Sequence, residues 1–402
     1  MSLTRLDKAA SLSILGATGS IGQSTLAIVR EVENLSVFAL SANSNVQALL
    51  AQCLEFKPRY AVICDRSFGP ELSAALAEQG SATEVLVGEE GLAQIASAPG
   101  VDIVMAAIVG AAGLDSTLAA AGAGKKLLLA NKEALVMTGG LLLNAARESG
   151  ATLLPVDSEH NAIFQCLPTV SAGISDEQFR HVDKLVLTAS GGPFLRTPLG
   201  EFSEITPAEA CAHPVWSMGS KISVDSATMM NKGLEYIEAC QLFGLPPEQL
   251  EVIIHPQSIV HSFVHYNDGS VLAQMASPDM RVPIAHSLAW PQRIQTQAPR
   301  LNLQSQPALE FLAPDLARFP CLSLGIEAAK AGGTAPALLN AANEEAVAAF
   351  LEERLDYLGI AEINAQVMAQ IPCEPASSLA IIRDADAQAR KLANLLISNR
   401  II

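Results

Sequence analysis

Two acidic residues lie close together in the segment 155–160, Pro-Val-Asp-Ser-Glu-His, directly after an apolar run. Because only Ser158 separates Asp157 from Glu159, their carboxylates can converge on one hard cation, and Mg²⁺ and Mn²⁺ prefer oxygen ligands. One interpretation of the pair is therefore a divalent-metal site. The alternative is an exposed turn followed by a helix cap.

Charged and polar residues are densest in the segment 213–235. We expect a helix over residues 226–243, on which Asn231 and Glu235 share a face one turn apart. Glu235 can then give the metal a third carboxylate. The neutral and cationic residues nearby suit phosphate oxygens: Ser226, Asn231 and Lys232. The alternative for Lys232 and Glu235 is a solvent-exposed pair three residues apart.

Three further segments are candidates for ligand contacts. Ser190 lies in a Gly-rich turn after a predicted strand, where its hydroxyl and the backbone N–H groups can meet an anion. Trp216 lies between Pro214 and Gly219, a composition typical of a lid, here residues 213–220, or of a local core anchor. We interpret the histidines 255, 261 and 265 as structural, since no paired cysteines lie near them to close a zinc site.

A glycine-rich turn follows the first predicted strand, with glycines at positions 16, 19 and 22 before a predicted helix. Such a turn lets the backbone approach a pyrophosphate at the helix N-terminus, so a dinucleotide site is predicted; the alternative is a tight strand–helix turn. No acid lies between Glu33 and Glu55, where an NAD enzyme needs a carboxylate for the ribose diol. The polar neutral residues Asn43, Ser44 and Asn45 favour NADP, although an N-cap turn there is compatible with either cofactor.

Lys132 follows a strand in the run Leu129-Ala130-Asn131-Lys132-Glu133. Since open α/β sheets bind ligands at the carboxyl ends of their strands, we expect Lys132 near the nicotinamide. The alternative is a helix start with a solvated lysine.

The elements that must position these residues fall into distinct segments. Up to residue 157, short β-branched runs alternate with helix-like segments, which predicts a doubly wound, Rossmann-like parallel sheet that binds NADPH. We expect an α+β catalytic domain over 158–290 with antiparallel strands and a hairpin at Asn267-Asp268-Gly269, a linker over 291–320, and a helical bundle over 321–402.

Composition limits the classes of partner. The 402 residues include 41 acids and 25 bases, a net charge of −16, which argues against nucleic acid or a membrane surface as partner. Mean hydropathy is +0.30, but no apolar run reaches the length of a span. Asp7 and Lys8 interrupt the core that a signal peptide needs, and the seven cysteines are scattered without a C-x-x-C pair. We expect a cytoplasmic protein with free thiols.

With these motifs in place, the sequence resembles the 1-deoxy-D-xylulose 5-phosphate reductoisomerase family over nearly its whole length. The blocks that carry the resemblance are, in order, GATGSIG, LLANKEALV, PVDSEHNAIFQ, TASGGPF, HPVWSMGSKISVDSATMMNKGLE and IHPQSIVHSFV. The family converts its ketose phosphate to 2-C-methyl-D-erythritol 4-phosphate in non-mevalonate isoprenoid synthesis, using NADPH and Mg²⁺ or Mn²⁺. The resemblance also implies that the protein forms a homodimer.

The resemblance implies roles for individual residues. The metal ligands would be Asp157, Glu159 and Glu235. Contacts to the cofactor would come from Thr18, Gly19, Ser20 and Ile21 at the pyrophosphate, Asn43, Ser44 and Asn45 at the adenosine phosphate, and Asn131, Glu133 and Gly219 at the nicotinamide side. Contacts to the substrate would come from Ser190, Ser226, Asn231 and Lys232 at its phosphate and hydroxyls, and from Lys132, Ser158 and His213 near the reacting carbons, with Trp216 in the loop above. Ser44 stands where some members have a basic residue.

Two other functions share part of this pattern. A plain NADP-dependent dehydrogenase of the homoserine or aspartate-semialdehyde type has the same first domain but gives no reason for three carboxylates. A non-catalytic dinucleotide-sensing protein with a helical interaction tail would bind the cofactor without turnover.

Overall fold

The chain folds around a parallel sheet in the computed structural model, which describes residues 4–168, 173–174, 176–216 and 218–400. The 7-stranded sheet has the order β4-β3-β2-β1-β5-β6-β7, so the strand order reverses beside β1. Its strands are β1 (Ala10–Leu15), β2 (Leu35–Ala42), β3 (Tyr60–Ile63), β4 (Glu84–Val87), β5 (Ile103–Ala106), β6 (Lys126–Leu129) and β7 (Thr152–Pro155). This confirms the predicted doubly wound sheet, because each β-branched run forms a strand.

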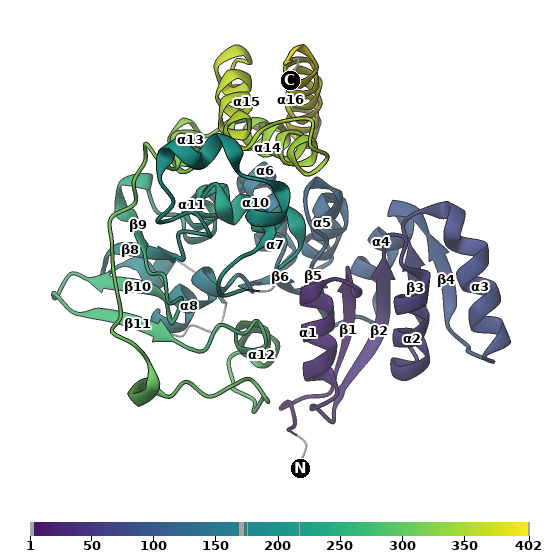
Figure 1. Cartoon of the computed structure of the whole chain (residues 1–402). Coiled ribbons are helices and arrows are strands. Elements are labelled where there is room, and N and C mark those ends of the chain that lie inside the picture. The colour runs from purple at the N-terminus through teal and green to yellow at the C-terminus, as the bar shows by residue number, and fades with distance from the viewer. Residues whose placement is uncertain (1–3, 169–172, 175, 217, 401–402) are drawn as a thin grey trace.

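Helices cover both faces of this sheet (Figure 1). They are α1 (Ser20–Val29), α2 (Val46–Phe56), α3 (Gly69–Glu78), α4 (Gly88–Ser97), α5 (Leu114–Gly122) and α7 (Gly140–Ser149). Helix α6 (Lys132–Thr138) follows β6 and packs mainly against helices of the later part of the chain. On the face of α1 and α2, the core is completed by α12 (Arg281–Ala289), whose Ile284 and Leu288 are buried against it. The compact unit around the sheet is thus not one continuous piece of the chain.

A second, 4-stranded sheet has the order β11-β10-β8-β9. Its strands are β8 (Val182–Ala189), β9 (Leu250–Ile254), β10 (Val260–Tyr266) and β11 (Val271–Met275). The predicted hairpin is confirmed, since β10 pairs antiparallel with β11 and Gly269 takes a φ of +87° in the turn. The expectation of antiparallel strands holds for β10 against β8 and β11, whereas β8 and β9 are parallel.

The prediction of one helix over residues 226–243 is wrong at its N-terminal end. The structure has α10 (Ser220–Ala227) and then α11 (Met230–Phe243), with Met229 between them at a φ of +62°. The physical reason is Thr228, whose hydroxyl accepts from Met230 N at 3.3 Å and so diverts a donor that a continuous helix would direct to a backbone carbonyl.

The remaining helices are α8 (Ser158–Cys166), α9 (Pro207–Cys211), α13 (Pro320–Ala331), α14 (Ala335–Leu351), α15 (Tyr357–Gln370) and α16 (Leu379–Asn399). The last four form the helical C-terminal region at the top of Figure 1. Two turn-forming pairs, Gly332-Gly333 and Ile371-Pro372, predict breaks in the helical pattern, and α13 and α15 end directly before them. Gly325 of α13 packs against Gly233 of α11 so closely that a Cβ on Gly325 would lie 2.4 Å from the Gly233 Cα.

Within the segment predicted as a linker, Leu312 pairs with Ile254 in an isolated β-bridge. Among the described residues, no helix has both the length and the apolar character needed to cross a bilayer.

Candidate active site

The predicted site residues gather around one cavity of about 460 Å³. It is lined from the parallel sheet's edge by Gly19, Ser20, Ile21, Asn131, Lys132 and Glu133, from α8 and its cap by Asp157, Ser158 and Glu159, and from the segment 190–235 by Ser190, His213, Trp216, Gly219, Ser226, Asn231, Lys232 and Glu235. Thr18 and Asn43–Asn45 lie outside this lining. Ser217, within the predicted lid, lies outside the described residues, and closure of that loop stays a prediction.

The three predicted metal ligands come together. Ligand oxygens of Asp157, Glu159 and Glu235 all lie within 4.8 Å of one another. Asp157 is the N-cap of α8, Glu159 is in that helix's first turn, and Glu235 enters from α11. Three clustered carboxylates fit Mg²⁺ or Mn²⁺, since both prefer oxygen ligands. Among the described residues, the histidines 255, 261 and 265 form no such cluster.

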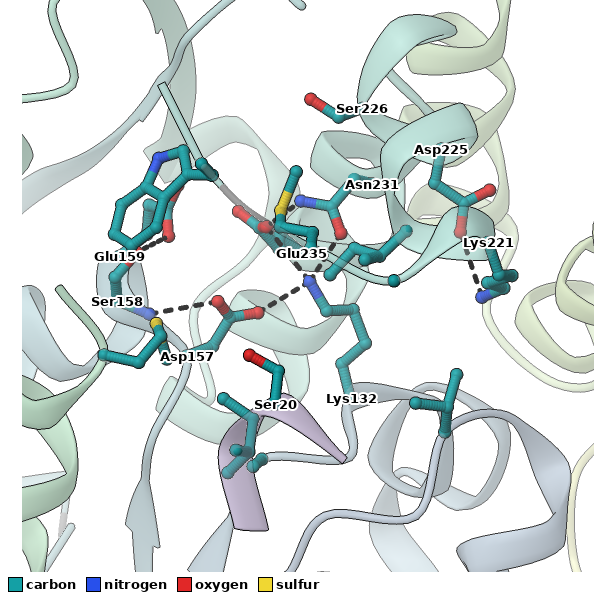
Figure 2. Close-up of a pocket in the computed structure, with 18 of the residues that line it drawn as sticks. Ser20, Lys132, Asp157, Ser158, Glu159, Lys221, Asp225, Ser226, Asn231 and Glu235 are labelled. Atoms are coloured by element: carbon teal, nitrogen blue, oxygen red, sulfur yellow. Dashed lines mark hydrogen bonds and ion pairs between the residues drawn. The ribbon is translucent and has the colours of Figure 1, made fainter. Parts of the chain in front are cut away.

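Two buried lysines neutralise these carboxylates in the structure. The Nζ of Lys132 lies 2.6 Å from Asp157 Oδ2 and 3.0 Å from Glu235 Oε1, as Figure 2 shows. The Nζ of Lys232 lies 2.7 Å from Glu159 Oε1 and also contacts Glu235. The Lys232–Glu235 pair that we considered as an alternative is therefore present, but it is buried rather than exposed to solvent. Three carboxylates and two ammonium groups leave one negative charge, which favours a cation.

Burial and charge set the protonation of this cluster. Burial alone would raise the pKa of Asp157, but the neighbouring positive charges, Lys132 first among them, together outweigh it and lower that pKa to about 2. Burial would lower the pKa of Lys132, yet the carboxylates of Asp157 and Glu235 raise it well above its usual value. The pKa of Glu235 is raised by burial and by Glu159. The site therefore holds charged groups that are largely screened from water, where electrostatic interactions are strong.

Asn231 shares a face of α11 with Glu235, as predicted, and its amide donates to Glu235 Oε1. Its own Oδ1 accepts from Lys132 Nζ at 2.7 Å. Ser226 also lines the cavity, from α10. These contacts tie Asn231 to the carboxylate cluster and to Lys132.

Ser190 and His213 form a hydrogen-bonded pair across the cavity wall, with Ser190 Oγ 2.9 Å from His213 Nε2. The Nδ1 of His213 accepts from the backbone N–H groups of Val215 and Trp216, so Nε2 carries the proton and donates to Ser190. Burial lowers the pKa of His213, which keeps the ring neutral. Because Ser190 Oγ also accepts from Gly192 N, its own proton is left for a ligand oxygen.

The glycine turn has the backbone that an anion needs. Gly16 has a φ of +85°, and a Cβ on it would lie 2.7 Å from Ala107 O, so only glycine fits. Gly19 occupies the N-cap position of α1 but has no side chain that could accept a hydrogen bond there. The first backbone N–H groups of α1 are therefore left for a ligand at the edge of the cavity.

Two residues predicted to contact the cofactor, Asn131 and Asn45, have side chains that cap helices. The Asn131 side chain caps α6 by accepting from Ala134 N at 2.6 Å and donates to Gly110 O, so its amide is already engaged. Asn45 caps α2 in the same way, accepting from Ala48 N at 3.0 Å. The N-cap that we considered as an alternative for Asn45 is therefore present.

Sequence reasoning missed several residues around the cavity. The Nζ of Lys221 lies 2.7 Å from Glu133 Oε1 and 3.0 Å from Asp225 Oδ2. The spacing of four residues between Lys221 and Asp225 could have predicted the second of these ion pairs, because such residues share a helix face. Asp225 is held in turn by Asn343 of α14 at 2.7 Å. His261, taken as structural, also lines the cavity beside Trp216.

The fold and the cavity define a class: dinucleotide-binding α/β enzymes with a carboxylate site for a divalent metal. Family models described as 1-deoxy-D-xylulose 5-phosphate reductoisomerase match residues 12–139, and those of its C-terminal domains match residues 153–243 and 275–392. The chain belongs to the 1-deoxy-D-xylulose 5-phosphate reductoisomerase family.

Relatives with that name agree over nearly the full chain. The protein from Cellvibrio japonicus is 57% identical, covering 96% of this chain and 98% of its own, and that from Dechloromonas aromatica is 56% identical, covering 97% and 98%. A crystal structure of DOX-P reductoisomerase with NADPH, fosmidomycin and magnesium has a TM-score of 0.93 at 49% identity, covering 97% of this chain and 98% of that one. The Zymomonas mobilis enzyme in complex with NADPH has a TM-score of 0.88 at 48% identity, covering 97% and 99%.

Proposed function

We propose that this chain converts 1-deoxy-D-xylulose 5-phosphate to 2-C-methyl-D-erythritol 4-phosphate, with NADPH as hydride donor and Mg²⁺ or Mn²⁺ as cofactor. The observation that carries the proposal is one cavity in which the glycine turn, three convergent carboxylates and a set of neutral and cationic anion-binding groups face one another. Family membership and the NADPH- and magnesium-bound relatives support the same activity.

Each part of the cavity has a task in this reaction. When bound by Asp157, Glu159 and Glu235, the divalent cation supplies a Lewis acid for the oxygens of the substrate. Lys132, adjacent to those carboxylates, stabilises negative charge that develops on a substrate oxygen.

The substrate phosphate is the part that a plain dehydrogenase would not need to hold. Ser190 presents its hydroxyl proton, and Ser226, Asn231 and Lys232 line the same cavity. Binding the phosphate away from the reacting carbons orients the substrate, which can supply much of the rate enhancement. The N-terminus of α1 takes the cofactor's pyrophosphate, beside Ser20 and Ile21.

The test is NADPH oxidation with purified protein, 1-deoxy-D-xylulose 5-phosphate and Mn²⁺, with the unphosphorylated sugar as matched control. We expect turnover that a chelator abolishes and that the unphosphorylated sugar supports poorly. Turnover of the ketose phosphate that is indifferent to chelator would favour a plain dehydrogenase. NADPH binding without turnover would favour a dinucleotide sensor.

We also propose that the protein is a homodimer and works in the cytoplasm. Strand β11 lies at an edge of the second sheet and exposes 46% of Val271 and 48% of Leu272, an apolar edge that a second copy would cover. The cysteines are all free, which suits a reducing compartment. Light scattering on the wild type and on Leu272→Asp checks the dimer; a wild-type monomer at micromolar concentration would exclude it.

A further inference from the structure

Residues 4–157 place a single cation at the corner of the parallel sheet where β2 and β3 end. The lysines and arginines of residues 4–157 are Arg5, Lys8, Arg30, Lys57, Arg59, Arg66, Lys125, Lys126, Lys132 and Arg147. Only two of them follow the carboxyl end of a strand: Arg66 follows β3, and Lys132 follows β6. The others precede or begin strands, or lie in or just after helices, and so belong to the edge of the sheet where the strands begin. Lys132 is held among the metal ligands, so Arg66 is the cation left for the cofactor at this edge of β1–β4.

The backbone places Arg66 beside the predicted adenosine-phosphate turn. Cys64 N donates to Ala42 O at 2.9 Å, and Asp65 N donates to Asn43 O at 3.0 Å, so the loop after β3 is tied to the loop after β2. Residues 43–45 are all exposed there. An arginine one residue beyond this contact can reach a group bound on the Asn43–Asn45 turn.

The charges at this corner make that cation necessary for a phosphate. Ser44 and Asn43 are neutral, and the Asn45 side chain is committed to Ala48 N. The carboxylate of Asp65 accepts from the N–H and hydroxyl of Ser67, and these bonds lower its pKa, so it stays charged. Without Arg66, the corner would therefore present acids and neutral groups to a phosphate.

Arg66 is free to change partner. Its Nη2 contacts Glu90 Oε2, and the two side chains are 61% and 78% exposed. An exposed pair of this kind contributes little to stability and opens readily. A phosphate, in contrast, gives the guanidinium two acceptors and about two negative charges.

From these contacts we infer that Arg66 binds the 2′-phosphate of NADPH and sets the preference for NADPH over NADH, in a chain whose β2 turn has no cation of its own. The inference rests on the proposed function only in assuming that this fold binds the dinucleotide along the carboxyl edge of the sheet. Glu90 is then the resting partner of Arg66, and the cofactor's phosphate replaces it.

The test is equilibrium binding of NADPH and NADH by calorimetry, without substrate or metal. In Arg66→Gln we expect the Kd for NADPH to rise about tenfold or more, while the Kd for NADH changes less than about twofold. Arg59→Gln is the matched control, because it removes the same charge from an exposed arginine at the other end of β3. We expect it to leave both constants unchanged, and Glu90→Gln to leave NADPH binding equal or tighter.

A second variant separates position from charge. Ser44→Arg, made in the Arg66→Gln chain, places a cation on the neighbouring turn and should restore the preference for NADPH. The inference is wrong if Arg66→Gln weakens both cofactors equally, if Arg59→Gln has the same effect, or if Ser44→Arg fails to restore the ratio. These readouts stand apart from the proposed function, which fails on absence of turnover in a wild-type chain that still binds NADPH.

Discussion

The Nζ atom of Lys132 lies 2.6 Å from the Oδ2 atom of Asp157, and the two side chains are only 7% and 16% exposed. The lysine begins α6, after β6, and the aspartate caps α8, after β7, so adjacent strands deliver the two groups to the same point. The cation that we propose for the reaction and a proposed ligand for the metal thus interact directly, and each affects the other's charge.

Replacing Lys132 with Met tests this relationship. We expect kcat to fall by about 10²–10³, the usual cost of losing one group that stabilises developing charge. We expect Mn²⁺ to bind equally well or more tightly, because a competing positive charge is removed. Kinetics and a Mn²⁺ titration in parallel measure both; weaker Mn²⁺ binding would show that Lys132 supports the metal site instead.

Glu235→Gln keeps the size of the side chain and removes its charge. We expect activity at limiting Mn²⁺ to be lost and the Kd for Mn²⁺ to rise by more than about a hundredfold, beyond the cost of losing an outer partner. The Kd for NADPH should stay within about twofold. Glu251→Gln, in an exposed pair with Lys184, is the control. Normal activity at limiting metal would remove Glu235 from the site.

The contact between α11 and α13 predicts a stability effect. In Gly325→Ala the new Cβ meets the backbone of Gly233, so we expect the free energy of unfolding to fall by about 1–3 kcal/mol. Gly122→Ala, on α5, meets nothing within 4 Å and should change it by less than about 0.5 kcal/mol. Urea denaturation of the three proteins checks this, and equal stability would mean that the helices separate at little cost.

His286 predicts a pH dependence of stability. Burial, chiefly, lowers its pKa to about 4 from 6.5, and its Nδ1 faces the Asn161 amide at 3.1 Å. Since the unfolded chain binds a proton between those values and the folded chain does not, stability falls as pH drops through this window, by about 2 kcal/mol at pH 5. We expect His286→Gln to lose less stability between pH 7 and pH 5 than the wild type. Parallel urea curves at the two pH values decide it.

Most of the fold followed from the sequence because its signals are local. The β-branched runs marked the strands of the parallel sheet, and the turn residues marked the breaks after α13 and α15. The break at Met229 was missed, since a hydroxyl that competes for backbone bonds looks like any other threonine in a helical pattern.

The site was less accessible to prediction. Acid spacing indicated the cluster of Asp157, Glu159 and Glu235, but the contacts of Lys132 and Lys232 with residues far away in the sequence depend on tertiary packing. Lys232 was assigned to phosphate with a Lys232–Glu235 pair as the alternative; the structure contains that pair and adds Glu159 as a second partner. Lys221 was visible as half of a helical pair, whereas its link through Asp225 to Asn343 joins segments far apart in the chain.

The position of α12 has a consequence for how the protein is made. The parallel sheet is fully synthesised once residue 155 has been added, but Ile284 and Leu288, which cover part of its face, come much later. A nascent chain therefore carries uncovered apolar surface while the ribosome translates the second sheet. We expect a fragment ending at residue 157 to need a chaperone or to aggregate, and the folding of the nucleotide-binding unit to be completed only after α12 has emerged.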